Sequence, residues 1–392
     1  MKRTVKRIAA LLMAVSMMAA MTACGSSNED KIVIGCIGPI TGANAFYGQL
    51  LEDTITMMAE QCNEEGGLLG KEVELIVYDD RSDAIEATNA ARRAIQQDGV
   101  KVFIGTESSA TTLALAEVCE ENGVPFVTTL ATNSKVTQND DGSTRPYSFR
   151  ACLSDPQMGT IMGQYAYREL GYDSVGIIYN LGSDYSIGVM QQFSETFEAE
   201  GGTVVAAEAY NDGDVDYRAV LTTLQNAGDF DALYIAVGYY REAGLIAQQA
   251  RELGLNQPII STDCMMVANM FEIVSEEVEG AVYNASFIID APGVQQFLQD
   301  FTEKYGYDPS QDSAGDLVCA HDAWEMVTTA ITNAGTDDPE AIRDALENLG
   351  TIDILSGTLT VVPETHDTLR ECPIYRIENE QFIQIAEFKP TA

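Results

Sequence analysis

The chain has 392 residues and is strongly acidic, with 60 Asp and Glu against 22 Lys and Arg and a formal net charge of −38. A surface of this sign repels nucleic acid and anionic lipid headgroups, so we expect neither as a partner. The eight cysteines show no paired spacing and no C-x-x-C motif, so the sequence predicts no disulfide framework, no metal site and no cofactor.

The chain begins with a segment typical of export. Residues 1–7 contain four basic side chains, and residues 8–21 are uncharged and mostly apolar. A stretch of this length is shorter than the about 20 residues that a membrane span needs. The segment Met21–Cys24 resembles a bacterial lipobox, although Met21 stands where leucine is usual. We expect 1–23 to be a lipoprotein signal peptide, Cys24 to be lipidated and 24–30 to be a linker; a plain secretory peptide or an uncleaved anchor stays open.

Without residues 1–23 the chain keeps 18 Lys and Arg against 60 Asp and Glu, a formal charge of −42. We interpret this excess as a solvated acidic exterior of an exported protein, anchored by its lipid to the outer face of the cytoplasmic membrane. No later segment is long and apolar enough to span a bilayer.

From residue 31 the sequence alternates between short apolar runs and amphipathic helices, which indicates parallel sheets flanked by helices. The predicted strands are 31–37, 72–78, 100–104, 125–129, 174–179, 203–207, 232–237 and 280–283. The series runs to residue 149 and then starts again. Helices over 294–305, 315–333 and 339–349 and strands over 357–361, 373–377 and 382–388 complete the two lobes. The predicted fold class is therefore α/β with two Rossmann-like lobes.

Two of the predicted strands end in clusters of hydroxyl side chains. The run 100–104 leads into Ser108, Ser109, Thr111 and Thr112 at the start of a helix, and the run 125–129 leads into Thr132. Hydroxyls and free N–H groups at a helix start favour an anion, and parallel strands bind ligands at their carboxyl ends. The pattern indicates a small carboxylate-bearing ligand.

Several short motifs, in order, are similar to those of type I periplasmic binding proteins of the leucine/isoleucine/valine-binding branch. They are 37–42 with Tyr47 and Gly48, 63–67 with 70–71, 78–80, 108–114 with 124–125 and 131–133, 184–185, 238–240 and 254–255. The resemblance implies an extracytoplasmic receptor of an ABC importer, with two lobes joined by three crossovers. It implies lobe I as 31–149 plus 282–348 and lobe II as 150–281 plus 349–392.

The same resemblance implies a binding site for an amino acid, branched-chain or otherwise aliphatic. Ser108, Ala131 and Thr132 match the groups that bind the ligand carboxylate, and Asp263 matches the acidic residue that faces its ammonium group. The aromatic positions that line the cleft are matched by Tyr47, Tyr185 and Tyr239. The chain departs from the family in having aspartate rather than glutamate at residue 263, and Ser82 and Glu107 where some members have a disulfide.

Other interpretations remain open at this stage. Ser108 and Thr132 could be ordinary capping groups, Asp263 an exposed helix cap, and the tyrosines part of the core. The fold could bind another small organic acid or an amide, or act as a sensor for a membrane receptor. Motifs of nucleophilic, metal-dependent or nucleotide-dependent enzymes are missing, so we expect a monomeric binding protein that is no enzyme and that works with a permease and its ATPases.

Overall fold

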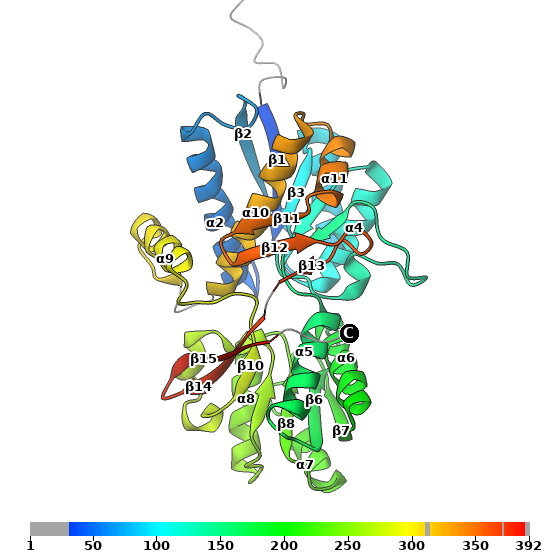
Figure 1. Ribbon diagram of the computed structural model, residues 1–392, viewed down its shortest axis with the longest axis vertical. Coiled ribbons are helices and arrows are strands. Elements are labelled where there is room, and N and C mark those ends of the chain that lie inside the picture. The colour runs from blue at the N-terminus through cyan, green and yellow to red at the C-terminus, as the bar shows by residue number, and fades with distance from the viewer. Residues whose placement is uncertain (1–30, 310–313, 371, 389–392) are drawn as a thin grey trace, which may run out of the picture.

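The protein folds into two α/β lobes arranged along its longest axis (Figure 1). The structure, a computed structural model, describes residues 31–309, 314–370 and 372–388. The predicted signal peptide, Cys24 and the predicted linker therefore lie outside the described residues. The predicted fold class is confirmed, since each lobe is built around a parallel sheet with helices on both faces.

Lobe I contains a five-stranded parallel sheet. Its strands, in spatial order, are β2 (Glu72–Asp79), β1 (Lys31–Gly38), β3 (Val102–Gly105), β4 (Phe126–Thr128) and β5 (Ser148–Arg150). The central strands are almost wholly buried because helices cover both faces, and this explains why their sequences are continuous apolar runs.

Successive side chains of β1 pack against different helices of lobe I. Ile32 and Ile34 join the core under the helices Ala45–Glu64 (α2) and Ala314–Ala334 (α10). Val33 and Ile37 join the core under the helices Ala84–Arg93 (α3) and Ser109–Asn122 (α4). The helices of this lobe are α2 (Ala45–Glu64), α3 (Ala84–Arg93), α4 (Ser109–Asn122), α9 (Pro292–Tyr305), α10 (Ala314–Ala334) and α11 (Pro339–Glu347).

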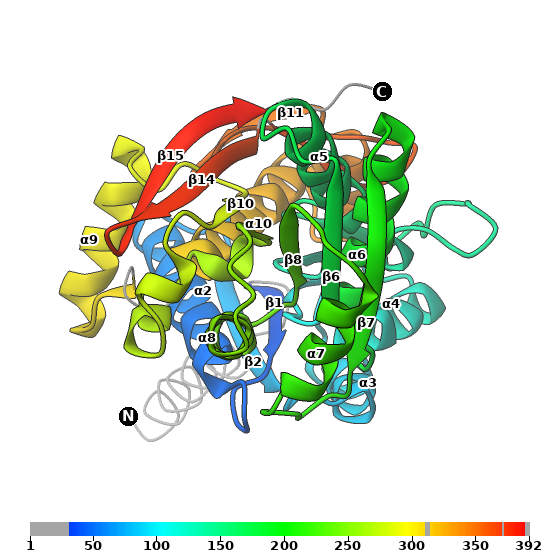
Figure 2. The same cartoon turned by 90° about the horizontal axis from the view of Figure 1, so that it is seen from below.

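Lobe II contains a seven-stranded sheet with a parallel part and an antiparallel edge. Its strands, in spatial order, are β15 (Gln381–Phe388), β14 (Cys372–Glu378), β10 (Val282–Asn284), β9 (Ile259–Ser261), β8 (Ala232–Ala236), β6 (Ser174–Asn180) and β7 (Thr203–Tyr210). The edge pair β14–β15 is antiparallel. Figure 2 shows this sheet from below, with its helices on both sides. They are α5 (Asp155–Arg168), α6 (Asp184–Glu200), α7 (Arg218–Ala227) and α8 (Tyr240–Glu252).

The eight strands predicted from apolar runs before residue 290 all form, with ends within a few residues of the prediction. The three helices and three strands predicted after residue 290 form as well. The sequence did not predict β5, β9, β11 and β13, which are only two to four residues long. Such strands are too short to show a periodic pattern.

Two of the predicted lobe boundaries are wrong. Residues 282–284, assigned to lobe I, form β10 between β9 and β14 of lobe II. Residues 349–369, assigned to lobe II, form a small antiparallel sheet beside lobe I. This sheet consists of β11 (Thr351–Ile354), β12 (Gly357–Val361) and β13 (Thr368–Leu369). Apolar runs this short do not reveal which sheet they join, so the pattern could not fix these boundaries.

The first boundary differs by a few residues only. Arg150, assigned to lobe II, is the last residue of β5 in lobe I, and lobe II begins with α5 at Asp155. The chain therefore crosses between the lobes at three places, near residues 151–154, near 285–291 and at Arg370.

Arg370 connects the three crossovers. It lies in the third one, and its guanidinium donates to the carbonyl of Ala151 in the first and to the carbonyl of Ser286 in the second, at 3.2 Å. The same group pairs with Asp322 on α10 at 3.4 Å and donates to Ser356 Oγ at 2.9 Å. Its side chain is 3% exposed and that of Asp322 is fully buried. The guanidinium of Arg370 thus holds the three crossover segments of the hinge against lobe I.

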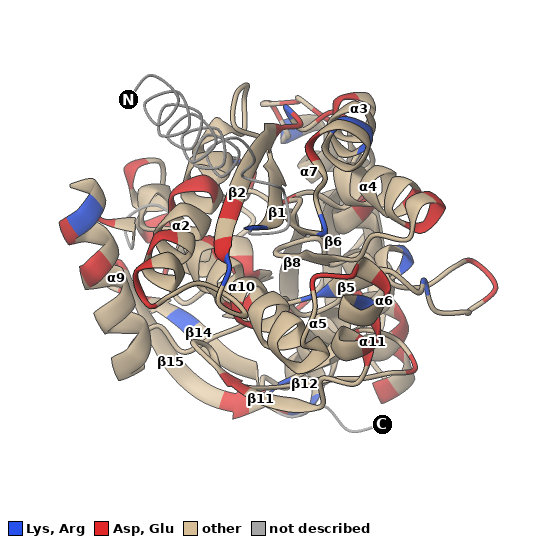
Figure 3. Cartoon of the chain, turned by 90° about the horizontal axis from the view of Figure 1, so that it is seen from above, with Lys and Arg blue, Asp and Glu red and all other residues tan. Residues whose placement is uncertain are grey.

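The exterior carries far more acidic than basic side chains, as the charge colouring in Figure 3 shows on α2, α9 and α11. Among the described residues, no helix is long and apolar enough to cross a membrane.

The first prediction concerns Arg370. Replacing it with methionine should lower the free energy of unfolding by about 3–5 kcal/mol, because Asp322 would keep a buried charge without its cation. Urea denaturation followed by circular dichroism measures this loss. Arg376→Met is the matched control, because its pair with Glu378 is exposed and contributes about 1 kcal/mol or less. Equal midpoints for the two variants would show that Arg370 does not stabilise the hinge.

Candidate functional site

A cavity of about 330 Å³ lies between the two lobes, within the range of small-molecule sites. It is lined from lobe I by the ends of β3 and β4, by the start of α4 and by Asn44 and Tyr47 near the start of α2. Lobe II contributes the loops that follow β6, β8 and β9. Strand ends from two parallel sheets therefore face one another across this space, the position at which open α/β sheets bind ligands.

Hydroxyl groups form the lobe I wall of the cavity. Ser108 caps α4, and its Oγ accepts from the backbone N–H of Thr111 at 3.3 Å. Ser109, in the first turn of α4, and Thr132 line the cavity beside it. Behind them, Thr106 Oγ1 bonds to the hydroxyls of Thr111 and Thr112 at 2.7 and 2.6 Å. The helix start thus presents hydroxyls and N–H groups to a negative ligand group.

Ala131 does not line the cavity, contrary to what the sequence resemblance implied. Its N–H donates to Thr128 Oγ1 at 3.2 Å, and its carbonyl accepts from Arg150 Nη1 at 3.0 Å. The residue is fully buried, and both of its backbone polar groups are hydrogen-bonded within lobe I. Leu130 and Thr132 line the cavity instead. Side chains therefore alternate along this loop between the cavity and the interior of lobe I.

The loop after β4 is held in place by Arg150. This fully buried guanidinium also donates to the carbonyl of Asn133 at 2.8 Å and to Thr137 Oγ1 at 3.1 Å, and it pairs with Asp367 at 2.7 Å. The position of Thr132 therefore depends on a charged group that the sequence pattern did not reveal.

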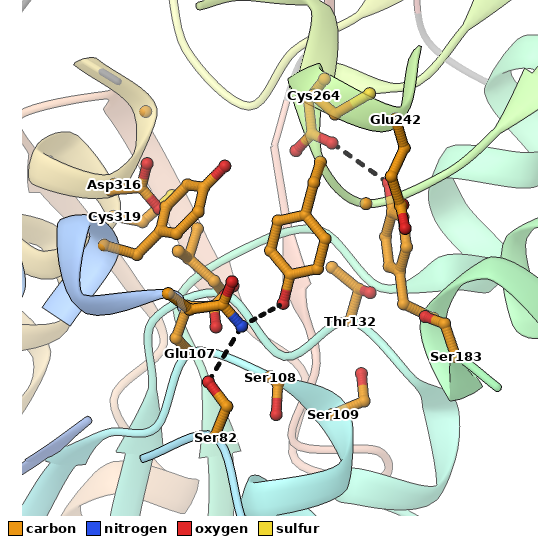
Figure 4. A pocket seen from close by; sticks show the side chains of 18 of the residues that line it. Ser82, Glu107, Ser108, Ser109, Thr132, Ser183, Glu242, Cys264, Asp316 and Cys319 are labelled. Carbon is orange, nitrogen blue, oxygen red and sulfur yellow. Dashed lines mark hydrogen bonds between the residues drawn. The ribbon is translucent and has the colours of Figure 1, made fainter. Parts of the chain in front are cut away.

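In lobe II, Asp263 begins a short 3₁₀ helix directly after β9. Tyr185, in the first turn of α6, donates its hydroxyl to Asp263 Oδ1 at 3.2 Å. Burial raises the pKa of Asp263 to about 6, although the tyrosine hydroxyl and two backbone N–H groups oppose this shift. Asp263 thus places a carboxylate acceptor in the wall of the cavity. Its neighbour Cys264 lines the same cavity (Figure 4).

Tyr47 and Tyr239 meet across the cleft. Their ring centroids are 5.5 Å apart, at an interplanar angle of 48°. Asn44 Nδ2 donates to Tyr239 Oη at 3.5 Å and to Ser82 Oγ at 3.0 Å. The turn that carries Tyr47 is tightly packed, since a Cβ on Gly48 would lie 2.2 Å from the carbonyl oxygen of Pro39. The three tyrosines predicted from sequence all line the cavity.

The sequence reasoning missed a set of acidic residues in the cavity wall. Glu107 stands between β3 and Ser108, and Asp316 belongs to α10, far away in sequence. Figure 4 shows both on one side of the pocket, with Glu242 on the opposite side. Burial raises the pKa of Glu107 to about 8, with smaller contributions from the charges of Asp316 and Asp80. A charged residue between an apolar strand and a capping serine was the available signal for Glu107.

Comparison with known proteins agrees with this geometry. The sequence profile of the periplasmic binding proteins matches residues 31–381. The chain belongs to this family.

Among its curated relatives, the leucine-, isoleucine-, valine-, threonine- and alanine-binding protein of Pseudomonas aeruginosa is 29% identical over 351 residues, which cover 88% of this chain and 89% of the relative. The crystal structure of the leucine-binding protein LivK from Thermotoga maritima superposes with a TM-score of 0.81 at 33% identity and covers 92% of this chain and 99% of that one. The LivJ structure from Streptococcus pneumoniae in complex with isoleucine gives 0.81 at 26% identity, covering 92% and 100%.

The two histidines of this periplasmic binding protein lie away from the cavity. His321 packs against Phe297, and burial lowers its pKa to about 4. His366 Nδ1 lies 3.1 Å from the carbonyl of Ser148, and its ring stacks on Phe149. The described residues contain no group of three His, Cys, Asp or Glu side chains that could hold a metal ion, and their seven cysteines are free thiols.

The second prediction concerns pH. Between about pH 4.5 and about pH 8 the folded protein keeps a proton on Glu107 that the unfolded chain releases, so stability of the ligand-free protein should fall as pH rises through this window. Glu242, with a pKa raised to about 7 by burial, acts in the same direction. The melting temperature at several pH values measures this slope.

Glu107→Gln should flatten the slope in the upper part of the window, while Glu117→Gln, on the exposed side of α4, should leave it unchanged. A melting temperature that rises from pH 6 to pH 8 would contradict the assignment of a protonated Glu107.

Proposed function

We propose that this chain is the extracytoplasmic solute-binding lipoprotein of an ABC importer. It binds an α-amino acid in the cavity between its lobes and delivers it to the permease, whose ATPases drive uptake. The observation that carries the proposal is the pairing of opposite ligand-binding chemistries across one cavity. Lobe I offers hydroxyls and a helix start at Ser108 and Thr132, and lobe II offers the acceptor pair Asp263 and Tyr185. A zwitterion fits between them.

Binding would couple to a hinge motion. A ligand that touches Ser108 in lobe I and Asp263 in lobe II favours the closed arrangement, because only there are both of its charged ends bound. The closed lobes would then present a joint surface to the permease. Family membership supports a role in solute binding outside the cytoplasm. The lipid anchor at Cys24 and a monomeric state belong to this proposal.

Which amino acid binds depends on the side chain that the cavity accepts. The names of the relatives favour leucine, isoleucine or valine, and the sequence resemblance predicts an aliphatic side chain as well. A thermal-shift screen against the twenty amino acids and simple organic acids tests the proposal. A shift from at least one amino acid is expected, and a shift from organic acids without amino groups alone would contradict it.

The third prediction concerns Asp263. Asp263→Ala should raise the dissociation constant of the amino acid found in the screen by more than about tenfold, because the buried ammonium group would lose its charged partner at a cost of about 2–5 kcal/mol. Isothermal titration calorimetry measures this change. Asp229→Ala removes an exposed carboxylate and should bind as the wild type does. Unchanged affinity of the Asp263 variant would remove this residue from the site.

A further inference from the structure

The charges that line the cavity are all of one sign. Among the described residues, no lysine or arginine lines it, and six acidic side chains do: Glu107, Asp184, Asp212, Glu242, Asp263 and Asp316. An acidic lining of this kind raises the local concentration of cations and disfavours anions.

Glu107 is the acidic residue of this lining whose surroundings most favour a cation. Its Oε2 is buried and has no hydrogen-bond partner, and no described Lys, Arg or His pairs with it. Asp80, which is fully buried, and Asp316, which is 6% exposed, add negative charge near it. A buried carboxylate in such surroundings is costly unless a cation or hydrogen-bond donors reach it.

Two tyrosine rings border the same part of the cavity. Glu107 is the main cause that raises the pKa of Tyr239, and Asp316 and Glu107 add to the effect of burial on Tyr47. Both tyrosines line the cavity that Glu107 and Asp316 also line. The faces of tyrosine rings attract ammonium and guanidinium groups, so these rings and carboxyls together form surroundings suited to a cation.

We infer that the ligand carries a second positive group, and that Glu107 and Asp316 receive it at the end of an α-amino acid side chain. The substrate class is then the basic amino acids, with an amine or guanidinium at the far end, rather than leucine or valine. Asp263 and Tyr185 would hold the α-ammonium group from lobe II, while the hydroxyl wall binds the carboxylate. This inference rests on the proposed binding of an α-amino acid, and it changes the expected side chain.

The alternative is that Glu107 stays protonated and uncharged when the ligand binds. A protonated Glu107 could donate a hydrogen bond to a ligand oxygen, and glutamine would preserve that role. For a cationic ligand, glutamine would instead remove the charge that selects it. Glu107→Gln therefore separates the two, and the variant should fold at least as stably as the wild type because it removes a buried ionisable group.

The experiment is calorimetric titration of wild-type protein and of Glu107→Gln with L-lysine, L-ornithine, L-leucine and 1,5-diaminopentane. We expect lysine or ornithine to bind the wild type more than about tenfold more tightly than leucine, and Glu107→Gln to reduce this preference by more than about tenfold. Asp316→Asn should act in the same direction. Glu117→Gln serves as the exposed control.

Proton release gives an independent readout. The titratable groups around Glu107 are Asp80, Asp316, Tyr47 and Tyr239, and Glu107 keeps its proton at neutral pH because its pKa is raised to about 8. A cation that pairs with it should displace the proton. Titrations in buffers of different ionisation enthalpy should show this release for lysine in the wild type and its loss in Glu107→Gln.

The outcomes distinguish the two proposals. Tighter binding of leucine than of both basic amino acids, or an unchanged preference in Glu107→Gln, would overturn this inference and leave amino-acid binding intact. The absence of binding by all four compounds would also overturn this inference, while the screen of twenty amino acids would still decide the proposed function. Binding of 1,5-diaminopentane together with silence from every amino acid in that screen would overturn both.

Discussion

The arrangement of the two lobes depends on a guanidinium in the hinge. Three chain segments cross between the lobes, and Arg370 binds carbonyls of the two segments to which it does not belong. Its buried pairing with Asp322 fixes this junction to α10 of lobe I. The three crossovers therefore form a single junction between the lobes. Strand ends of both sheets line the cavity that lies between the lobes.

A second buried guanidinium fixes the local geometry in the same way. Arg150 donates hydrogen bonds to the carbonyls of Ala131 and Asn133. The neighbouring residues Leu130 and Thr132 line the cavity. The pair of Arg150 with Asp367 connects the loop after β4 to the small antiparallel sheet. The segment 351–369 thus stabilises a binding loop more than 200 residues earlier in the chain, which explains why it lies with lobe I.

The sequence predicted those parts of the molecule that repeat a physical pattern. Buried parallel strands such as β1 and β8 are continuous apolar runs, and Ser108 lies where a strand end meets a helix start, so both were predictable. The three-residue strands β5 and β9 have no such pattern. The backbone of Ala131 was expected in the site, but its N–H is taken by Thr128, a contact that depends on the exact turn of the loop.

The sequence also could not predict which acidic side chains meet at the cavity. Asp316 comes from α10, some two hundred residues after Glu107, and nothing in their spacing indicates that they meet. Among 60 acidic residues, the few that face a cavity cannot be distinguished by composition. Their importance follows from burial and from neighbours of like charge, both of which are properties of the folded chain.

The distribution of these carboxyls has a consequence for closure. Glu107 and Asp316 belong to lobe I, whereas Asp263, Glu242 and Asp212 belong to lobe II, so closing the cleft brings their carboxyl groups closer together. Contacts between the lobes include Asn44 Nδ2 to Tyr239 Oη at 3.5 Å, Asn133 Nδ2 to the carbonyl of Asp184 at 3.1 Å, and the N–H of Asp155 to the carbonyl of Thr132 at 2.7 Å. A ligand with positive groups at both ends lowers the cost of closure in addition to making its own contacts, since it neutralises each lobe's edge. An aliphatic ligand lacks the second effect, so ligand charge and hinge motion are coupled through the same carboxyl groups.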